Sequence, residues 1–399
     1  MRISTANSFD AGIDTLTRRR SELADLQEQI SSGKRVARAS DDPAAAARAE
    51  RAMAAIGRAD TSQRAVDASQ VAMTQTESTL GEAGTLLQRA RELIVSAGNA
   101  SYGDSERKSI AKELQSIRDQ LFSVANQSDG AGTYLFGGQG ATQKPFIDSP
   151  GGVQYAAAPG QTLTELPTGL PLTTDGKAVW LSANTGNGVF VTTAAAGVTG
   201  ATIDNGRVSD PAALTGAGYT LQFNVAAGVT SYAVLKNGLA TAVTAAPYVT
   251  GQAITVDGMT VAVSGTPAAG DSFAIAPSTP TLSVFATLDK AVADLSTAGR
   301  TGSQVAQANA DGLRDVDAVL GGLQTARAAA GAVLNRIDSE TGRLADQKLA
   351  SQSERSNAED VDMVHAFSEY QNKQNGYDAA LKSYAMVQRL SLFQYVNGS

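Results

Sequence analysis

Apolar side chains recur at alternating spacings of four and three residues at both ends of the chain. Near the C-terminus this repeat consists of Met363, Phe367, Tyr370, Tyr377, Leu381 and Tyr384. Near the N-terminus it consists of Phe9, Ile13, Leu16, Leu23 and Ile30. Side chains spaced in this way lie along one narrow line of an α-helix, and that helix cannot bury them alone. We therefore expect these residues to form an assembly seam, in which the two chain ends pack against each other and then against neighbouring subunits.

A joint separates the N-terminal repeat from the helix that follows it. A Ser-Ser dipeptide and Gly33 should end the first helix, and the acids Asp41 and Asp42 stand directly before Pro43. A carboxylate side chain can accept hydrogen bonds from the free N–H groups at a helix start, and proline suits the first helical position. We therefore place the joint at residues 31–42 and expect a new helix to begin at Pro43.

A second joint is predicted before the C-terminal repeat. Residues 351–357 are polar and charged, so we expect them to interrupt the preceding helix. Three acids follow, Glu359, Asp360 and Asp362, and acidic residues favour a helix N-terminus through the helix dipole. Each terminal seam would then be separated by a joint from the helices between them.

Large apolar residues also recur at helical spacing between the two joints. Within residues 43–98, one recurs every seven positions from 66 to 94. Residues 110–124 carry an unbroken repeat of four and three, and the pattern resumes from 281 to 344. Glycines near residues 98–103 and 299–302 interrupt it. The spacing predicts long helices that need partners along their length, because isolated helices are marginal in water.

The middle of the chain has a different character. Only 11 of the 140 residues from 141 to 280 are charged, against 60 of the remaining 259. Apolar and polar residues alternate from Tyr219 to Val225, which is typical of a half-buried strand. Asn237-Gly238 and Asp257-Gly258 each lie between two apolar runs and predict tight hairpins. We expect a small antiparallel β domain here.

Together these patterns predict an α+β fold. A long antiparallel helical rod, similar to a coiled coil, is built from both chain ends and carries an inserted small antiparallel β domain. Three domains are expected. Residues 1–40 and 356–399 form the terminal coiled coil, residues 41–140 and 281–355 form the helical rod, and residues 141–280 form the β domain.

Charge and hydropathy exclude two classes of partner. The formal net charge is −7, whereas binding to nucleic acid requires a concentrated basic face. Arg18, Arg19 and Arg20 make the only strong basic run, and we interpret it as a solvated helix face. No apolar run approaches the roughly 18 residues that span a bilayer. We therefore expect neither a nucleic acid nor a membrane as partner.

The sequence offers little material for catalysis or for holding a metal ion or cofactor. It has no cysteine, and its single histidine, His365, has no second histidine with which to build a metal cluster. No Gly-x-Ser-x-Gly turn and no glycine-rich phosphate loop is present. The acids around Asp360 lack the central glycine of a calcium loop, and a helix start explains them better. We predict a protein that is not an enzyme and has no catalytic, cofactor-binding or metal site.

Several motifs resemble those of the flagellins and the related hook–filament junction proteins of bacteria. The N-terminal motif runs from Leu26 to Val36 and continues from Ser40 to Ala44, and the C-terminal likeness covers Leu381 to Leu392. With the helices between them, the likeness extends over about two thirds of the chain. The stretch from Gly132 to Gly138 and the ending from Leu392 to Val396 are more similar to junction proteins than to filament flagellins.

The resemblance implies a structural subunit of the bacterial flagellum. Subunits would form a short ring between a hook-side junction protein and the filament flagellin, with their paired terminal helices packed as a coiled coil. The resemblance also implies export through the flagellar type III apparatus and an extracellular location at the hook–filament junction. A cytoplasmic export chaperone is expected to cover the C-terminal seam before export.

Three other functions stay open at this point. A flagellin that forms long filaments belongs to the same class of protein. An enzyme or sugar-binding module in the β domain would need convergent charged groups, and 11 charges in 140 residues supply few. A type III translocator or needle-tip protein shares paired terminal helices, but it is not expected to combine Gly33-Lys34-Arg35 with Asp41-Asp42-Pro43.

Overall fold

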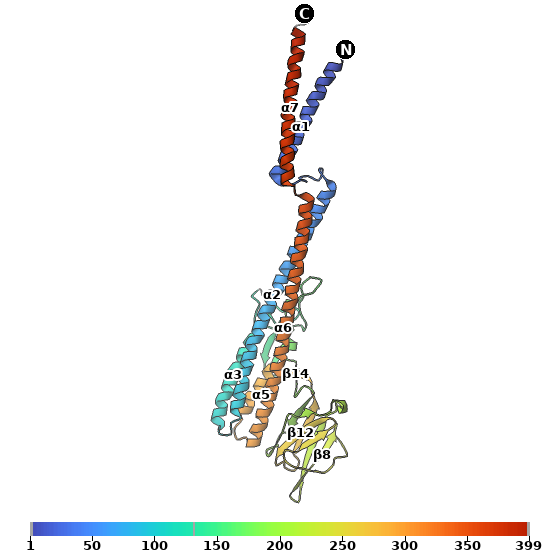
Figure 1. Cartoon of the computed structure of the whole chain (residues 1–399). Helices are drawn as coiled ribbons and strands as arrows, with labels where there is room; N and C mark the ends of the chain where they lie inside the picture. Colours follow the sequence, from blue (N-terminus) through green and yellow to red (C-terminus); the bar gives the residue numbers. More distant parts are fainter. Residues whose placement is uncertain (1–2, 131, 397–399) are drawn as a thin grey trace. The chain divides into compact units, whose positions relative to one another are not determined.

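The structure, a computed structural model, describes the backbone of residues 3–130 and 132–396 and the side chains of residues 10–130 and 132–386 (Figure 1). The chain divides into two compact units. The first combines Met1–Arg64 with Glu340–Ser399, and the second is Ala65–Ser339. Two long helices contribute residues to both units.

Long helices dominate the described part of the chain. They are α1 (Ile3–Ser32), α2 (Pro43–Ala97), α3 (Asp104–Ala125), α4 (Gly176–Trp180), α5 (Val284–Ser296), α6 (Gly302–Glu359) and α7 (Met363–Val396), with a 3-10 turn, η1, at Pro211–Ala213. Their ends follow local chemistry. The Ser283 hydroxyl, for example, accepts a hydrogen bond from the Ala286 N–H at 3.3 Å and caps α5.

The strands are short and lie between α3 and α5 in the sequence. They are β1 (Phe146–Ser149), β2 (Gly152–Tyr155), β3 (Ala183–Asn184), β4 (Phe190–Ala194), β5 (Ala201–Ile203), β6 (Arg207–Val208), β7 (Tyr219–Ala226), β8 (Val229–Lys236), β9 (Leu239–Ala240), β10 (Ala246–Pro247), β11 (Ala253–Val256), β12 (Met259–Gly265), β13 (Ser272–Pro277) and β14 (Pro280–Leu282). The pairs β1–β2, β4–β13, β7–β13, β3–β14 and β7–β8 are all antiparallel.

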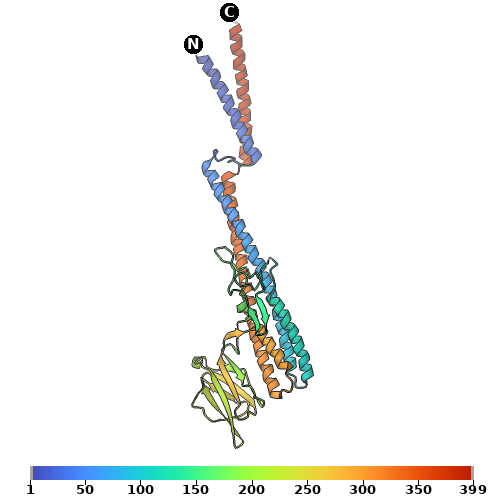
Figure 2. The same cartoon turned by 180° about the vertical axis from the view of Figure 1, so that it is seen from behind.

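The first unit contains α1 and α7, which lie side by side in both views and run in opposite directions (Figures 1 and 2). The start of α2 and the end of α6 belong to the same unit, where Lys348 of α6 and Asp60 of α2 form an ion pair at 2.7 Å. The two ends of the chain, remote in sequence, are thus brought together in one body.

The second unit contains a helical core built from α2, α3, α5 and α6. Buried leucines of one helix meet those of the others, among them Leu87, Leu114, Leu288 and Leu323. The β1–β2 hairpin and α4 close this core with aromatic rings. Trp180 stacks on the Phe285 ring with centroids 5.8 Å apart and meets other aromatic rings edge-on. The only tryptophan of the chain therefore reports on this core.

Two antiparallel sheets form the β domain of the second unit. One has the order β10-β8-β7-β13-β4 with β9 beside β8, and the other has the order β11-β12-β5 with β6 beside β12. Tyr219, Leu221 and Phe223 of β7 point into the core between them, which confirms the predicted alternation for these residues. Val225, the last apolar residue of the predicted pattern, is 37% exposed instead. The predicted hairpins are also confirmed. Asn237-Gly238 joins β8 to β9, and Asp257-Gly258 joins β11 to β12, with positive φ at all four residues.

The predicted fold class is confirmed: antiparallel helices from both chain ends are combined with an inserted antiparallel β domain. The division into three domains stays a prediction. The two hydrophobic cores divide the predicted β domain of residues 141–280. Residues 146–180 contribute side chains to the helical core, and the separate β core draws its side chains from residues 190–275.

The joint predicted at residues 351–357 is wrong. This stretch is helical, and α6 continues through it to Glu359. Polar residues such as Gln, Ser, Glu and Arg are tolerated in an exposed helix, and the stretch contains neither glycine nor proline to stop it. The interruption falls instead at residues 360–362.

Candidate assembly surface

Three contacts set the antiparallel register of α1 and α7. The Glu22 carboxylate and the Lys373 ammonium form an ion pair at 3.3 Å. A Cβ atom at Gly12 would lie 3.4 Å from the Tyr384 ring, and one at Gly376 would lie 2.8 Å from the Arg19 guanidinium. Glycine inside a helix costs roughly 0.5–1 kcal/mol of stability relative to alanine. The close approach of a large side chain from the facing helix explains why glycine stands at these two positions.

This register divides the predicted seam of α7 into two faces. Tyr370, Tyr377 and Tyr384 are half-buried. Met363, Phe367 and Leu381 are 44%, 52% and 40% exposed. A single partner helix covers only part of the α7 stripe, so the remaining apolar side chains stay uncovered in one copy of the chain.

The α1 side of the seam is better covered. Leu16, Leu23 and Ile30 are half-buried, whereas Ile13 is 48% exposed. The side chain of Phe9 lies outside the described residues, as do the side chains of residues 392–396, which carried part of the resemblance. The role of these residues in assembly stays a prediction.

Two buried residues of this helix pair are absent from the predicted seam. Leu26 of α1 and Ala366 of α7 are both buried. Leu26 follows Leu23 by three positions and precedes Ile30 by four, so the same spacing rule could have identified it. Ala366 carries too little apolar surface to stand out in the sequence.

The joint after α1 and the joint before α7 are bonded to each other. Gly33 has a positive φ of 72°, and its carbonyl accepts a hydrogen bond from the Val361 N–H at 3.0 Å. The Arg35 N–H donates to the Glu359 carbonyl at 2.7 Å. Lys34 and Asp360 form an isolated antiparallel bridge. Backbone hydrogen bonds therefore hold the two joints together.

The acids of the first joint organise the start of α2. The Asp42 carboxylate accepts from the Ala45 N–H at 3.0 Å, and Pro43 is the first residue of the helix. This backbone bond and the Arg35 guanidinium, 3.3 Å away, hold the pKa of Asp42 below its usual range. The Asp41 carboxylate accepts from the Arg38 N–H at 2.8 Å and closes the turn before it.

The acids of the second joint have different places. Asp362 caps α7, because its carboxylate accepts from the Val364 and His365 N–H groups at 3.0 and 3.1 Å. Glu359 instead ends α6, so its predicted place at the start of the last helix is wrong, and it pairs with Lys34 at 3.4 Å. His365 is exposed and lies 3.8 Å from Glu369.

The described residues offer neither a cluster of metal ligands nor a helix that could cross a bilayer. Among the side chains of residues 10–130 and 132–386, no group of three or more His, Cys, Asp or Glu could hold a metal ion. In the part of the chain whose helices are described, no helix combines the length and the hydropathy that crossing a bilayer requires.

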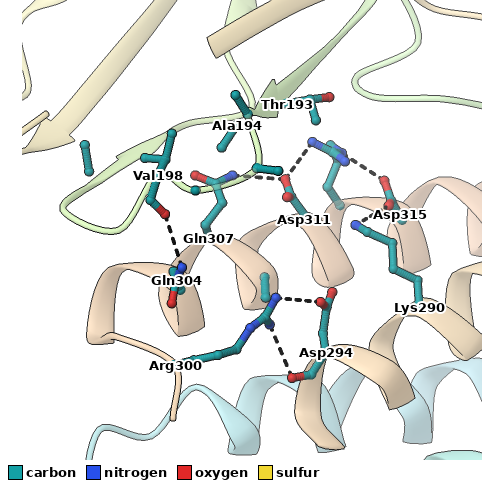
Figure 3. A pocket seen from close by; sticks show the side chains of 16 residues that line it. Thr193, Ala194, Val198, Lys290, Asp294, Arg300, Gln304, Gln307, Asp311 and Asp315 are labelled. Carbon is teal, nitrogen blue, oxygen red and sulfur yellow. Dashed lines mark hydrogen bonds and ion pairs between the residues drawn. The ribbon is translucent and has the colours of Figure 1, made fainter. Parts of the chain in front are cut away.

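A second surface, which sequence reasoning missed, joins the β domain to α6. Its side chains follow one stripe of the helix and reach backbone groups of the β domain (Figure 3). Gln307 accepts from the Ile203 N–H at 2.8 Å, and Arg314 donates to the Thr192 carbonyl at 3.0 Å. Thr301, which directly precedes α6, donates to the Thr199 carbonyl at 2.8 Å. These residues are polar and widely spaced, so no sequence signal marked them.

A cavity of about 400 Å³ lies beside this stripe, between the β4–β5 connection and the helices α5 and α6 (Figure 3). Its charged side chains are paired: Arg300 with Asp294 at 2.8 Å, and Arg314 with Asp311 at 2.9 Å. Burial raises the pKa of Asp311 above its usual range, although Arg314 opposes the shift. Because these charges are neutralised within the cavity, we interpret it as part of the polar contact between the β domain and α6.

Three protein-family models match the chain. The bacterial flagellin N-terminal helical region matches residues 3–141, and the bacterial flagellin C-terminal helical region matches residues 313–396. The D2-like domain of flagellar hook-associated protein 1 matches residues 191–277, which hold the β core. The first two models cover the helices that bring the chain ends together.

Known proteins extend this likeness. Flagellar hook-associated protein 3 of Salmonella typhimurium is 39% identical to this chain over 161 residues. The matched region is 38% of this chain and 48% of that protein. The chain therefore spans about half the length of the curated relatives it matches. The crystal structure of the flagellar junction protein FlgL from Legionella pneumophila is 28% identical in sequence, with a TM-score of 0.66, and the match covers 71% of this chain and 97% of that one. FlgL of Xanthomonas campestris, in space group C2, is 31% identical, with a TM-score of 0.69, covering 77% of this chain and 99% of that one. The chain therefore belongs to the bacterial flagellin family of structural flagellar proteins, within its FlgL, or hook-associated protein 3, branch.

Proposed function

We propose that the chain is a structural subunit of the bacterial flagellum and forms the junction between hook and filament. The observation that carries this proposal is the likeness to FlgL of Legionella pneumophila, which is described as a flagellar junction protein and of which this chain covers 97%. The likeness to Xanthomonas campestris FlgL at 31% identity supports it further. The location would be extracellular, with the hook-side junction protein and the filament flagellin as neighbours.

The geometry of the terminal helices supports assembly through the seam. In one copy, α1 covers the tyrosine face of α7 and leaves Met363, Phe367 and Leu381 partly exposed. Apolar surface that stays in contact with water favours association, because burial removes it from water at about 25 cal/mol per Å². Neighbouring copies would cover this face in the ring, and a cytoplasmic chaperone would cover it before type III export.

Deletion of the gene tests the proposal. Cells without this protein should still make hooks but release flagellin into the medium, because the filament lacks its attachment zone. Electron microscopy of the cell surface and immunoblotting of the medium measure the two effects, and expression of the intact chain should restore filaments. Filaments that remain attached in the deletion strain would contradict the proposal.

A flagellin that forms the filament itself is the second candidate. It is favoured by the two family models, which describe the helical regions of flagellin. Purified protein mixed with filament seeds separates the two functions. A filament flagellin lengthens the seeds, whereas a junction subunit leaves their length unchanged, and electron microscopy measures that length.

A further inference from the structure

Three consecutive arginines in the middle of α1 have no acidic partner among the side chains that the structure describes. Arg18, Arg19 and Arg20 are exposed, and no carboxylate among the side chains described for residues 10–130 and 132–386 lies within ion-pair distance of them. Lys373 of the facing helix, by contrast, has two acidic partners, Glu22 at 3.3 Å and Glu369 at 3.4 Å. In the described part of this helix pair, Lys373 is therefore neutralised by acidic side chains, whereas the three arginines are not.

Two of these arginines line a groove of about 490 Å³ between α1 and α7. The groove holds three cations, Arg18, Arg19 and Lys373, and two carboxylates, Glu22 and Glu369. Both carboxylates already pair with Lys373. The two guanidinium groups are thus left to attract negative charge from outside the copy.

The matching charge lies on the same helix, nearer its N-terminus. Asp10 and Asp14 are exposed and four residues apart, so they share one face of α1 on successive turns. Among the described side chains, neither has a cation within ion-pair distance. They precede Arg18 by roughly 6–12 Å along the helix, at a rise of about 1.5 Å per residue. Along its axis, α1 consequently carries an acidic patch, Asp10 and Asp14, followed by a basic patch, Arg18 and Arg19.

We propose that Asp10 and Asp14 of one copy pair with Arg18 and Arg19 of a neighbouring copy, and that this contact sets the stagger between adjacent α1 helices. The inference rests on the proposed function, which requires a polymer of this chain. A polymer is built by heterologous contacts, in which one patch of a subunit meets a different patch of the next. The acidic and basic patches of α1 are such a pair, and both are present on every copy.

Electrostatics also disfavours the competing alignment. If two copies met without a stagger, the arginines of one would face the arginines of the other, and like charges in contact repel. Exposed ion pairs contribute little to stability in water. Their effect on alignment is larger, because the unstaggered arrangement is penalised while the staggered one is favoured. The contact therefore selects a register, whereas the apolar seam supplies the attraction.

Two variants of the full-length chain test the contact. In the acidic variant, Arg18→Glu and Arg19→Glu make both patches negative. In the basic variant, Asp10→Lys and Asp14→Lys make both patches positive. Each purified variant is added to hooks isolated from the deletion strain, and the amount that sediments with the hooks is measured. We expect each variant alone to bind at least about tenfold less than the wild-type chain, since a difference of about 1.4 kcal/mol corresponds to a factor of ten.

A mixture of the two variants separates a contact between copies from a contact within one copy. Within each variant the two patches of α1 carry charges of the same sign, but between an acidic copy and a basic copy every contact of one patch with the other is attractive. The equimolar mixture should therefore bind several-fold better than either variant alone. Mixtures that bind as poorly as the single variants would show that the charges act within one helix, which would overturn the proposal. Wild-type binding by either single variant would overturn it as well.

A control carries the same change of net charge on the other unit. Lys144→Glu with Arg207→Glu alters two exposed cations there and should bind like the wild-type chain. Trp180 fluorescence verifies that the helical core of each variant is folded. If the wild-type chain itself does not bind the hooks, the proposed function fails. If it binds and the acidic variant binds equally well, only the charge contact fails.

Discussion

Arg118 of α3 and Asp148 of β1 form a two-bonded ion pair. The Nη1–Oδ2 and Nη2–Oδ1 distances are 2.5 and 2.9 Å, and Arg118 Nε also donates to Asp289 of α5 at 3.0 Å. The Arg118 side chain is buried, and its guanidinium lies 5.7 Å from the centre of the Phe122 ring. One guanidinium thus ties three segments together beside the aromatic core around Trp180.

We predict that Arg118→Ala lowers the free energy of unfolding by about 2 kcal/mol, because hydrogen bonds between charged groups and the packing of a buried side chain are both lost. Urea denaturation followed by Trp180 fluorescence measures this change. The matched control is Arg91→Ala, which breaks the exposed pair with Asp317 at 2.6 Å. It should leave the free energy of unfolding close to that of the wild-type chain, because ion pairs on the surface contribute little in water. Equal effects of the two substitutions would contradict the structural role of Arg118.

The same pair predicts a dependence on pH. The Arg118 guanidinium holds the pKa of Asp148 below its usual range. An acid whose pKa is depressed in the folded state stabilises the fold above its unfolded pKa of about 3.9, and this stability is lost as the pH falls through the folded pKa. We expect Asp148→Asn to make the fall of the melting temperature below pH 4 shallower. In an Arg118→Ala background, Asp148→Asn should leave the slope unchanged. If the slope is the same with and without Arg118, the pair does not cause it.

The exposed face of α7 predicts the effect of a buried charge on assembly. Leu381→Asp should leave the helical core folded and abolish incorporation into the flagellum, because the carboxylate would be desolvated between copies. Leu239→Asp is the control, since Leu239 is 74% exposed on the β domain. Motility assays and immunoblots of purified flagella measure the difference. Normal motility of cells that carry Leu381→Asp would refute the assigned role of this face.

The left-handed conformation of Gly33 predicts that a side chain there weakens the joint. Gly33 has a positive φ, and a Cβ atom would meet no atom within 4 Å, so the expected cost of Gly33→Ala is backbone strain of about 1 kcal/mol. We expect limited trypsin digestion at the neighbouring Lys34 and Arg35 to become about fivefold faster, a factor that corresponds to about 1 kcal/mol. Gly84→Ala is the control, because Gly84 lies within α2 with open space around it, and alanine there should not speed digestion at the joint. Digestion of Gly33→Ala at the wild-type rate would mean that the joint bears no strain.

Much of the fold could be predicted from local patterns. The four-and-three spacing of apolar residues identified the helices, alternation identified β7, and Asn237-Gly238 and Asp257-Gly258 identified two hairpins. These signals are local, because helix and strand periodicities and positive-φ turns depend on neighbours along the chain. The stretch 351–357 misled the prediction, since polarity alone does not end a helix.

The sequence by itself determined that both chain ends form long helices with an apolar stripe, that Asp42 and Pro43 can begin a helix, and that the middle of the chain forms strands. Only the tertiary structure decided which side of the α7 stripe faces α1, because that depends on where Gly12 and Gly376 let large side chains pass. It also decided that the α6 residues Gln307 and Arg314 hold the β domain. The physical reason is that periodicity specifies a surface, whereas the partner of that surface is set by contacts between residues hundreds of positions apart.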